Sequence, residues 1–495
     1  MVNRSDKRAF HGTIYLMIAQ MAIMGGSYII AVVLARGLGP ELYGVYGIVY
    51  SILLSVELVG RLGFPQATAK LIAEADTDEH VHEATGFSLA IIVYGLIFAT
   101  FWFSSPYLAQ LFNVTEGADL FRIASLDIPF YGVYFMMVHI LAGHRRFLQQ
   151  SIANIVYIAV KIVGILVLEY IGPTVNGALL VNVVGSVLAL LVTIPLVGLR
   201  PFRLTLRHSK PLLLLAGPAA LIALGTQVLM GVDLWLLNAL GSNISDTIKG
   251  YYVAAMNIAR IPSIVAFVLT SVLVPTIARA LKTGDRATTI QTLHGAVRFM
   301  AIGLLASSAL MAANSNEIMT LLFSSEYANG ANLLSVLVFA QGFFVPVYMV
   351  MSNVLFATGD AARSATLSMI VVVLAFLVCS ILVILGGAYG ASLGSLITTA
   401  LATAAIFVVV KRTVGFVPNW LMVIKVTAAV AIVTFISFLF EVDGILLIAE
   451  FAVIGLLYLA TLFVFGLVTR EDLDLLVPNK RSSKSGAIAQ TTSQG

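Results

Sequence analysis

The stretch TLSMIVVVLAFLVCSILVIL, residues 366–385, contains no charged side chain. A helix of about 20 apolar residues is long enough to cross the hydrocarbon core of a bilayer. Similar runs recur along the 495-residue chain, in which 60% of residues are hydrophobic, 11% are charged and the mean hydropathy is +1.00. Water-soluble globular domains do not reach such values, so the sequence predicts an all-α polytopic membrane protein.

Fourteen mostly apolar runs are predicted to be transmembrane helices. The first follows a basic head and is longer than the core of a signal peptide, so we expect it to remain as a span. The single cysteine, Cys379, lies within a span, which excludes an intrachain disulfide and a cysteine metal site. The predicted spans are residues 12–35, 42–62, 84–105, 119–142, 148–170, 176–198, 211–239, 249–275, 288–312, 329–357, 363–385, 389–410, 419–440 and 444–468.

Lysine and arginine are distributed unequally between the two sides of the predicted membrane. With the N-terminus in the cytoplasm, 21 of the 28 lie in inner segments, whereas only Arg36 and Lys249 fall in outer loops. This asymmetry predicts a multi-pass protein of the cytoplasmic (plasma) membrane with both termini inside. The longest connection has about twenty residues, so no soluble catalytic domain is expected, and the polar tail 470–495 is predicted to be disordered.

A short internal repeat predicts two related halves. LGPELYGVYG (38–47) leads to LGFPQATAK (62–70), as LGSNISDTIKGYY (240–252) leads to SVLVPTIAR (271–279), so that Gly44 matches Gly250 and Pro65 matches Pro275. Six spans separate the copies, and an even number means that both run the same way through the bilayer. We therefore expect pseudo-symmetric six-helix lobes at 1–200 and 211–412 with the substrate path between them, and two additional helices at 418–469.

Basic side chains inside the spans indicate the kind of cargo, because a charge in a membrane is costly and is kept for a function. Arg260, Lys161 and Arg298 have no acid three or four residues away, and Arg61 follows Glu57 by one helical turn. An excess of bases around a cavity attracts an anion such as pyrophosphate. We predict Arg61, Lys161, Arg260 and Arg298 as substrate-binding residues.

Two buried acids are candidates for carrying a coupling ion, Glu57 and Asp233. The alternative for Glu57 is an ion pair with Arg61 on the same helix. Asp127 is expected to cap a helix or to pair with Arg122 rather than to take part in chemistry. Amides within the spans are expected to form hydrogen bonds between helices: Gln20, Asn154, Asn182, Asn257, Gln341 and Asn353.

Residues 34–74, LARGLGPELYGVYGIVYSILLSVELVGRLGFPQATAKLIAE, resemble the N-terminal signature of the polysaccharide-transport flippases of the multidrug/oligosaccharidyl-lipid/polysaccharide exporter superfamily. Residues 259–285 and 318–370 resemble later parts of the same family. The resemblance implies two six-helix lobes arranged in a V, and movement of a polyprenyl-pyrophosphate-linked oligosaccharide to the outer leaflet by alternating access. In such flippases bases of spans one, two and eight line the cavity. Arg61 and Arg260 match spans two and eight, whereas span one has no base before Arg36.

Several other classes fit the residues less well. No GxxxxGK[ST] motif occurs, so an ion gradient or the membrane potential is the expected energy source. A multidrug cation exporter of the same fold needs an excess of buried acids, and a membrane glycan polymerase or ligase needs a sizeable outer loop. We therefore expect a transporter and not an enzyme, with no cofactor, metal or nucleic acid. Its expected partners are the polyprenyl-linked oligosaccharide, the lipid bilayer and membrane proteins of glycan assembly.

Overall fold

A computed structural model describes residues 4–61, 63–75, 79–114, 117–198, 205–206, 209–263, 266, 273, 276–277, 279–280, 285–358, 361–439, 444 and 446–467. The regular elements in these residues are all helical, as expected in lipid, where a spanning segment must satisfy its own backbone hydrogen bonds. The predicted tail 470–495 lies outside the described residues.

The helices are α1 (Arg4–Arg61), α2 (Phe64–Glu74), α3 (Glu79–Leu111), α4 (Gly117–Ser125), α5 (Asp127–Gly143), α6 (Phe147–Ile171), α7 (Val175–Val197), α8 (Ser209–Leu240), α9 (Asp246–Ala259), α11 (Arg286–Met300), α12 (Ala306–Ala313), α13 (Ser315–Leu322), α14 (Ala331–Leu337), α15 (Val345–Ala357), α16 (Ala361–Val414), α17 (Trp420–Phe438) and α18 (Leu446–Val464), with π-helices η2 (Ala301–Leu305) and η4 (Val338–Phe344) and the 3-10 helix η3 (Ser325–Gly330).

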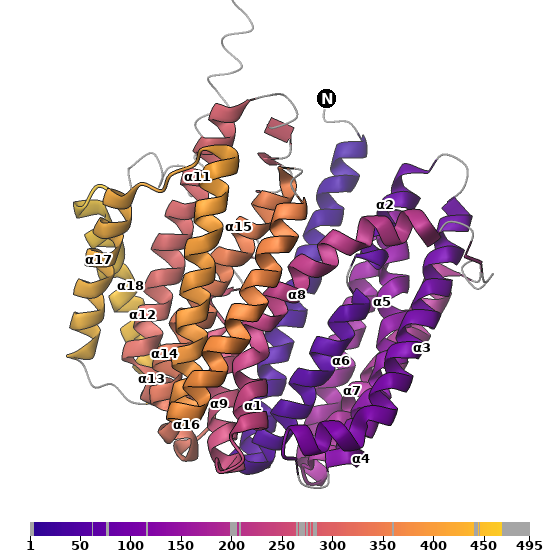
Figure 1. Cartoon of the computed structure of the whole chain (residues 1–495), viewed down its shortest axis with the longest axis horizontal. Helices are drawn as coiled ribbons and strands as arrows, with labels where there is room; N and C mark the ends of the chain where they lie inside the picture. The colour runs from indigo at the N-terminus through magenta and orange to yellow at the C-terminus, as the bar shows by residue number, and fades with distance from the viewer. Residues whose placement is uncertain are drawn as a thin grey trace, which may run out of the picture.

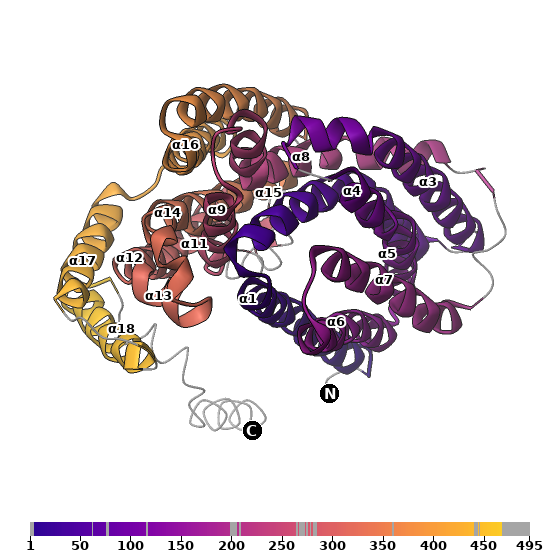
Figure 2. The ribbon, with the colours of Figure 1, turned by 90° about the horizontal axis from the view of Figure 1, so that it is seen from below.

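The helices are arranged as two lobes side by side, with a helix pair at one edge (Figure 1). Helices α1 to α7 form the N-lobe, and α8 to α16 form the C-lobe. The pair α17 and α18 packs beside the C-lobe, on the side away from the N-lobe (Figure 2). This arrangement confirms the predicted fold class of two six-helix lobes with two additional helices.

Ten described helical segments are long and apolar enough to cross a membrane. Two of them contain two predicted spans each, because α1 turns back at Gly39 (φ 71°, ψ 170°) and α16 at Gly387 (φ 56°, ψ −133°). Glycine adopts these positive φ values without steric cost. We call the end of the bundle at which α1 and α16 turn back the distal end. It is the lower end in Figure 1.

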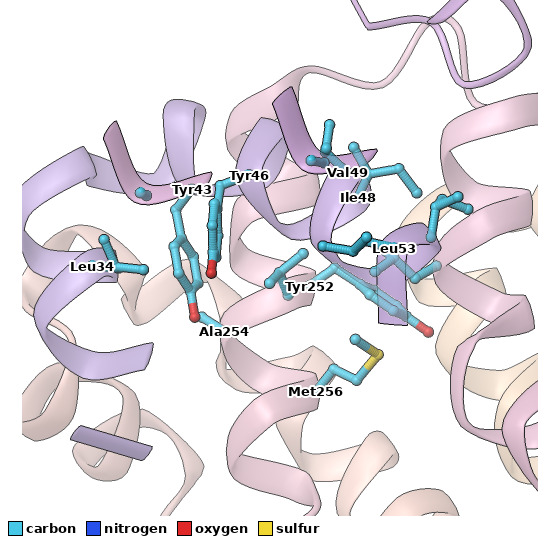
Figure 3. Close-up of a cluster of buried hydrophobic side chains, with 14 of the residues drawn as sticks. Leu34, Tyr43, Tyr46, Ile48, Val49, Leu53, Tyr252, Ala254 and Met256 are labelled. Atoms are coloured by element: carbon cyan, nitrogen blue, oxygen red, sulfur yellow. The ribbon is translucent and has the colours of Figure 1, made fainter. Parts of the chain in front are cut away.

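Helices α1 and α9 form the closest contact between the lobes, at two glycines. A Cβ on Gly44 would lie 2.4 Å from the carbonyl oxygen of Asp246, and one on Gly250 would lie 1.7 Å from the carbonyl oxygen of Pro40. The two glycines that the repeat pairs therefore meet at the lobe interface. Figure 3 shows buried side chains of α1 and α9 in the core, among them Leu34, Tyr43, Tyr46, Tyr252 and Met256.

Candidate functional site

A cluster of charged and phenolic groups lies inside the N-lobe around Lys161 of α6, which is 5% exposed. Its Nζ donates to the hydroxyl of Tyr157 at 2.9 Å and lies 4.7 Å from the centroid of that ring. Glu57 of α1 and Asp127 of α5 are equally buried, and both carboxylates act electrostatically on the ammonium. The lobe thus brings together one base and two acids from three helices.

This cluster unites two residues that the sequence predicts for different roles, Lys161 and Glu57. Asp127 joins them, although its sequence neighbours gave no sign of it. The base expected beside Asp127, Arg122, forms its ion pair with Asp119 at 3.0 Å. Asp127 is the first residue of α5 and follows the break between α4 and α5. The helical pattern of apolar residues is interrupted at this break, so it does not show which way Asp127 faces.

Tyrosines and amides surround the N-lobe cluster. The rings of Tyr46 and Tyr50 are stacked with their centroids 5.3 Å apart, and those of Tyr134 and Tyr157 at the same distance. Tyr134 donates to Asn154 at 2.8 Å. The predicted use of an embedded amide between helices is thus confirmed at Asn154, and α5 and α6 are joined by it.

A second polar cluster lies in the C-lobe around Asp233 of α8, which is fully buried. Its carboxylate accepts from the hydroxyl of Tyr252 at 2.8 Å and from the backbone N–H of Leu234 at 2.8 Å, and it also interacts with Ser395. Gln341 donates to Ser395 at 3.2 Å, and its Oε1 is buried without a hydrogen-bond partner among the described residues. Carboxylate, amide and hydroxyl oxygens from α8, η4 and α16 therefore converge here.

The backbone of this cluster is irregular where Gln341 enters it. Gln341 lies in the π-helix η4 (Val338–Phe344), and π-turns within helices are frequent at functional sites. Its Nε2 also donates to the carbonyl oxygen of Leu229 at 3.1 Å, so the amide holds η4 against α8.

Arg260 follows the last residue of α9, beside the Asp233 cluster. The helix ends at Ala259, and Pro262, which cannot donate a helical hydrogen bond, follows in the next turn. The guanidinium is half-buried, donates through Nη2 to the carbonyl oxygen of Met230, and interacts electrostatically with Asp233 and with Tyr28 of α1. Its Nε has no hydrogen-bond partner among the described residues. Arg260 is thus placed between α8 of the C-lobe and α1 of the N-lobe.

The other predicted bases are not brought to this place by any described contact. Arg298 of α11 donates through Nε and Nη2 to the carbonyl oxygen of Leu467, at 3.1 and 2.5 Å, which fastens the end of α18 to the C-lobe. The side chain of Arg61 lies outside the described residues. Of the six candidates, the structure therefore groups four as two pairs, Lys161 with Glu57 and Arg260 with Asp233, and leaves Arg298 apart; the side chain of the sixth, Arg61, is not described.

Polar contacts close the lobes against each other at the distal end. Arg36 of α1 donates through Nε to the carbonyl oxygen of Leu322 at 2.8 Å and through Nη2 to that of Leu321 at 2.6 Å, at the C-terminus of α13. The hydroxyl of Tyr327 donates to the carbonyl oxygen of Ala35 at 2.7 Å. We call these contacts, together with the Gly44–Gly250 approach, the distal seal. The sequence places Arg36 in an outer loop and gives no sign of this role.

The fold and these clusters define a multi-pass membrane protein with the two-lobed architecture of known transporters. A family model described as "Polysaccharide biosynthesis protein" matches residues 9–281, more than half of the chain. The chain belongs to this family. A comparison with curated protein sequences found no match.

Solved structures of transporters share the fold. The structure titled lipid II flippase MurJ in an inward closed conformation has a TM-score of 0.76 and 16% identity, covering 91% of this chain and 98% of that one. A multidrug resistance MATE family transporter in its inward-facing conformation has a TM-score of 0.71 and 16% identity, covering 82% and 98%. An outward-facing MATE transporter has a TM-score of 0.58 and 17% identity, covering 82% and 95%.

Proposed function

We propose that this chain is a flippase that moves a polyprenyl-pyrophosphate-linked oligosaccharide across the cytoplasmic membrane, for the assembly of a cell-surface glycan. Membership of the polysaccharide biosynthesis family supports the glycan, and the fold shared with a lipid II flippase supports a lipid-linked cargo. We propose that the chain is a transporter and not an enzyme, because the solved structures that share its fold are transporters. Its partners are then the lipid-linked substrate, the bilayer and the membrane proteins that make and use the glycan.

The observation that carries this proposal is the position of Arg260 between the lobes. A guanidinium that is half-buried, with an Nε that makes no hydrogen bond within the described protein, retains a donor for an anion. Its planar fork matches the oxygens of a phosphate group. We propose that Arg260 binds the pyrophosphate, with Arg61, the last residue of α1, as a second ligand. Lys161 and Arg298 are also predicted ligands, but their donors already contact Tyr157 and Leu467, and we propose that Arg298 holds the end of α18 rather than the cargo.

Alternating access provides the mechanism. With the distal seal formed, the cargo enters from the opposite side, which we propose is the cytoplasm. Binding energy at Arg260 then favours the state in which the seal opens, because a ligand shifts a conformational equilibrium only through its different affinity for the two states. The prenyl chain stays in the lipid while the polar head crosses.

A cation bound in either lobe is proposed to drive the return. Asp233 is the candidate in the C-lobe, where the unpartnered oxygen of Gln341 and the hydroxyl of Ser395 stand beside it. Glu57 is the candidate in the N-lobe. We expect Asp233→Asn to abolish the dependence of transport and of thermal stability on the coupling cation, whereas Asp119→Asn, which changes an exposed acid paired with Arg122, keeps both.

The test of the function is the fate of lipid-linked oligosaccharide in cells. Deletion of the gene is expected to accumulate it in the inner leaflet, and the wild-type gene to clear it. Arg260→Ala is expected to fail and Arg260→Lys to restore export in part, because an ammonium keeps the charge and loses the fork. Arg146→Ala, which removes an exposed arginine bonded to Leu196 within the N-lobe, is the matched control. Absence of accumulation on deletion refutes the function, and full export by Arg260→Ala refutes the site.

A cation exporter is the second candidate function, favoured by one observation. Glu57 and Asp127 bring two buried carboxylates against a single ammonium in a tyrosine-rich lobe. Such a lobe would suit an organic cation by charge and by cation–π contact. Cells overproducing the chain would then resist cationic dyes, and Glu57→Gln would remove that resistance without affecting lipid-linked oligosaccharide.

A further inference from the structure

Glu450 of α18 is a buried acid that takes no part in either cluster. Helices α17 and α18 meet each other and the C-lobe through apolar side chains, and they expose others, such as Phe435 and Val453, on their outer side. Within this apolar pair the Glu450 side chain is only 8% exposed. A carboxyl group at such a place is costly if it is ionised and unpaired, so its surroundings decide what it does.

Glu450 ends a chain of hydrogen bonds that crosses three helices. Asn314, at the junction of α12 and α13, donates through Nδ2 to Ser437 Oγ at 2.9 Å. Ser437 of α17 donates to Glu450 Oε1 at 2.7 Å. Asn314 and Ser437 are also buried. Glu450 Oε2 is buried and has no hydrogen-bond partner among the described residues. The chain therefore leads from a helix break at the distal end to a carboxyl oxygen with unused hydrogen-bonding capacity.

No described base of the helices packed here neutralises Glu450. In α12, α13, α17 and α18 the other ionisable side chains are Glu317, Lys425 and Tyr458. Lys425 donates to the carbonyl oxygen of Phe465, beyond the far end of α18, and Tyr458 donates to that of Ile302. Glu441 and Asp443, in the connection between α17 and α18, lie outside the described residues. The described residues therefore offer Glu450 no positively charged partner. A proton is small enough to neutralise the carboxylate at this buried site, and Oε2 is free to accept it.

We propose that Glu450 is a proton-binding site near the distal end, held in place by the hydrogen bonds of Asn314 and Ser437. In the ionised form, Asn314 donates to Ser437 and Ser437 donates to the carboxylate. When a proton adds to the unpartnered Oε2, Oε1 still accepts from Ser437, and Asn314 keeps its donations to Ser437 and to the carbonyl oxygen of Leu310. The heavy atoms keep their contacts, and the carboxylate has gained one proton.

Proton binding at Glu450 changes the charge between α17–α18 and the C-lobe by one unit. The neutral acid suits the surrounding apolar side chains, so proton uptake favours the docked pair. This site lies outside both clusters used for transport and does not depend on the proposed cargo. Its function is to make the attachment of α17 and α18 respond to the pH at the distal face.

Carbodiimide labelling tests the proposal on the full-length protein in detergent or membranes. Dicyclohexylcarbodiimide adds to a protonated carboxyl group in an apolar site, and the adduct rearranges to a stable N-acylurea that mass spectrometry locates. We expect Glu450 to be labelled at low pH, and the labelling to fall as rising pH ionises the carboxyl group. Glu450→Gln must lose the labelled peptide.

Two further variants distinguish a proton site from a buried acid that only packs. Ser437→Ala removes the donor that stabilises the carboxylate, so labelling should persist to higher pH. Thr434→Ala, which removes a hydroxyl of the same helix that has no described partner, should leave the pH profile unchanged. Wild-type protein that is never labelled at Glu450, or is labelled equally at every pH, overturns the proposal. So does a Ser437→Ala profile equal to that of the wild type.

Discussion

The distal seal provides the sharpest prediction, because a single side chain bridges the lobes at two points. Arg36→Ala removes two charge-assisted hydrogen bonds to the C-terminal carbonyls of α13, at 2.8 and 2.6 Å. Hydrogen bonds to charged groups and contacts with a helix C-terminus each contribute on the order of 1 kcal/mol, and the exposure of Arg36 reduces that value. We expect about 1–2 kcal/mol less stability of the sealed state, which corresponds to a roughly 5- to 30-fold larger population of molecules with the seal open.

Spin-label distances across the distal end measure this shift. Leu111 at the end of α3 and Asn316 of α13 are exposed on opposite lobes, so cysteines placed there in a Cys379→Ala background carry the labels. Arg36→Ala should add or enlarge a long-distance component. Arg146→Ala serves as the matched control, because it removes an arginine contact to a helix end within the N-lobe. If both variants give the wild-type distribution, the contacts of Arg36 do not hold the lobes together.

Three further predictions concern single sites. Gly44→Ala places a Cβ 2.4 Å from a backbone oxygen of α9, so we expect about 1–3 kcal/mol of destabilisation, read from the thermal unfolding of the purified protein, whereas Gly25→Ala, with no atom within 4 Å, should change little. Arg298→Ala loses the contacts to Leu467 and should lower thermal stability while export continues; a loss of export with unchanged stability would instead assign Arg298 to the substrate. The side-chain and backbone hydrogen bonds from Thr288 lower the pKa of Asp285, the exposed N-cap of α11. Because the folded pKa is below the unfolded value, the cap contributes its full stability above the unfolded pKa, near about 4. This contribution is lost as the pH falls through the folded pKa. Asp285→Asn should therefore flatten this part of the curve of stability against pH.

Sequence alone determined the membrane class, the order of the spans and the doubling into two lobes. These follow from local quantities: the length of each apolar run sets a helix that crosses the bilayer, and an even number of spans sets the direction of the repeat. The glycines at the turns of α1 and α16 could also be predicted, since hairpins within apolar runs need positive φ at a residue without a side chain. Arg260 was identified for a local reason too, because no acid lies within reach on its own helix.

Only the tertiary structure decided which of these side chains act together. Lys161 resembles Arg260 in sequence, yet it is buried against Tyr157 within reach of Glu57 and Asp127, which come from other helices. Arg36 and Glu450 carried no local signal, because a loop base and an acid near a span end are common. The carbonyls of α13 are far from Arg36 in the chain, and the hydroxyl of Ser437 lies on the helix before that of Glu450. Hydropathy is a property of each segment, whereas pairing across helices depends on how the segments rotate and pack, and a single sequence does not contain that information in any local pattern.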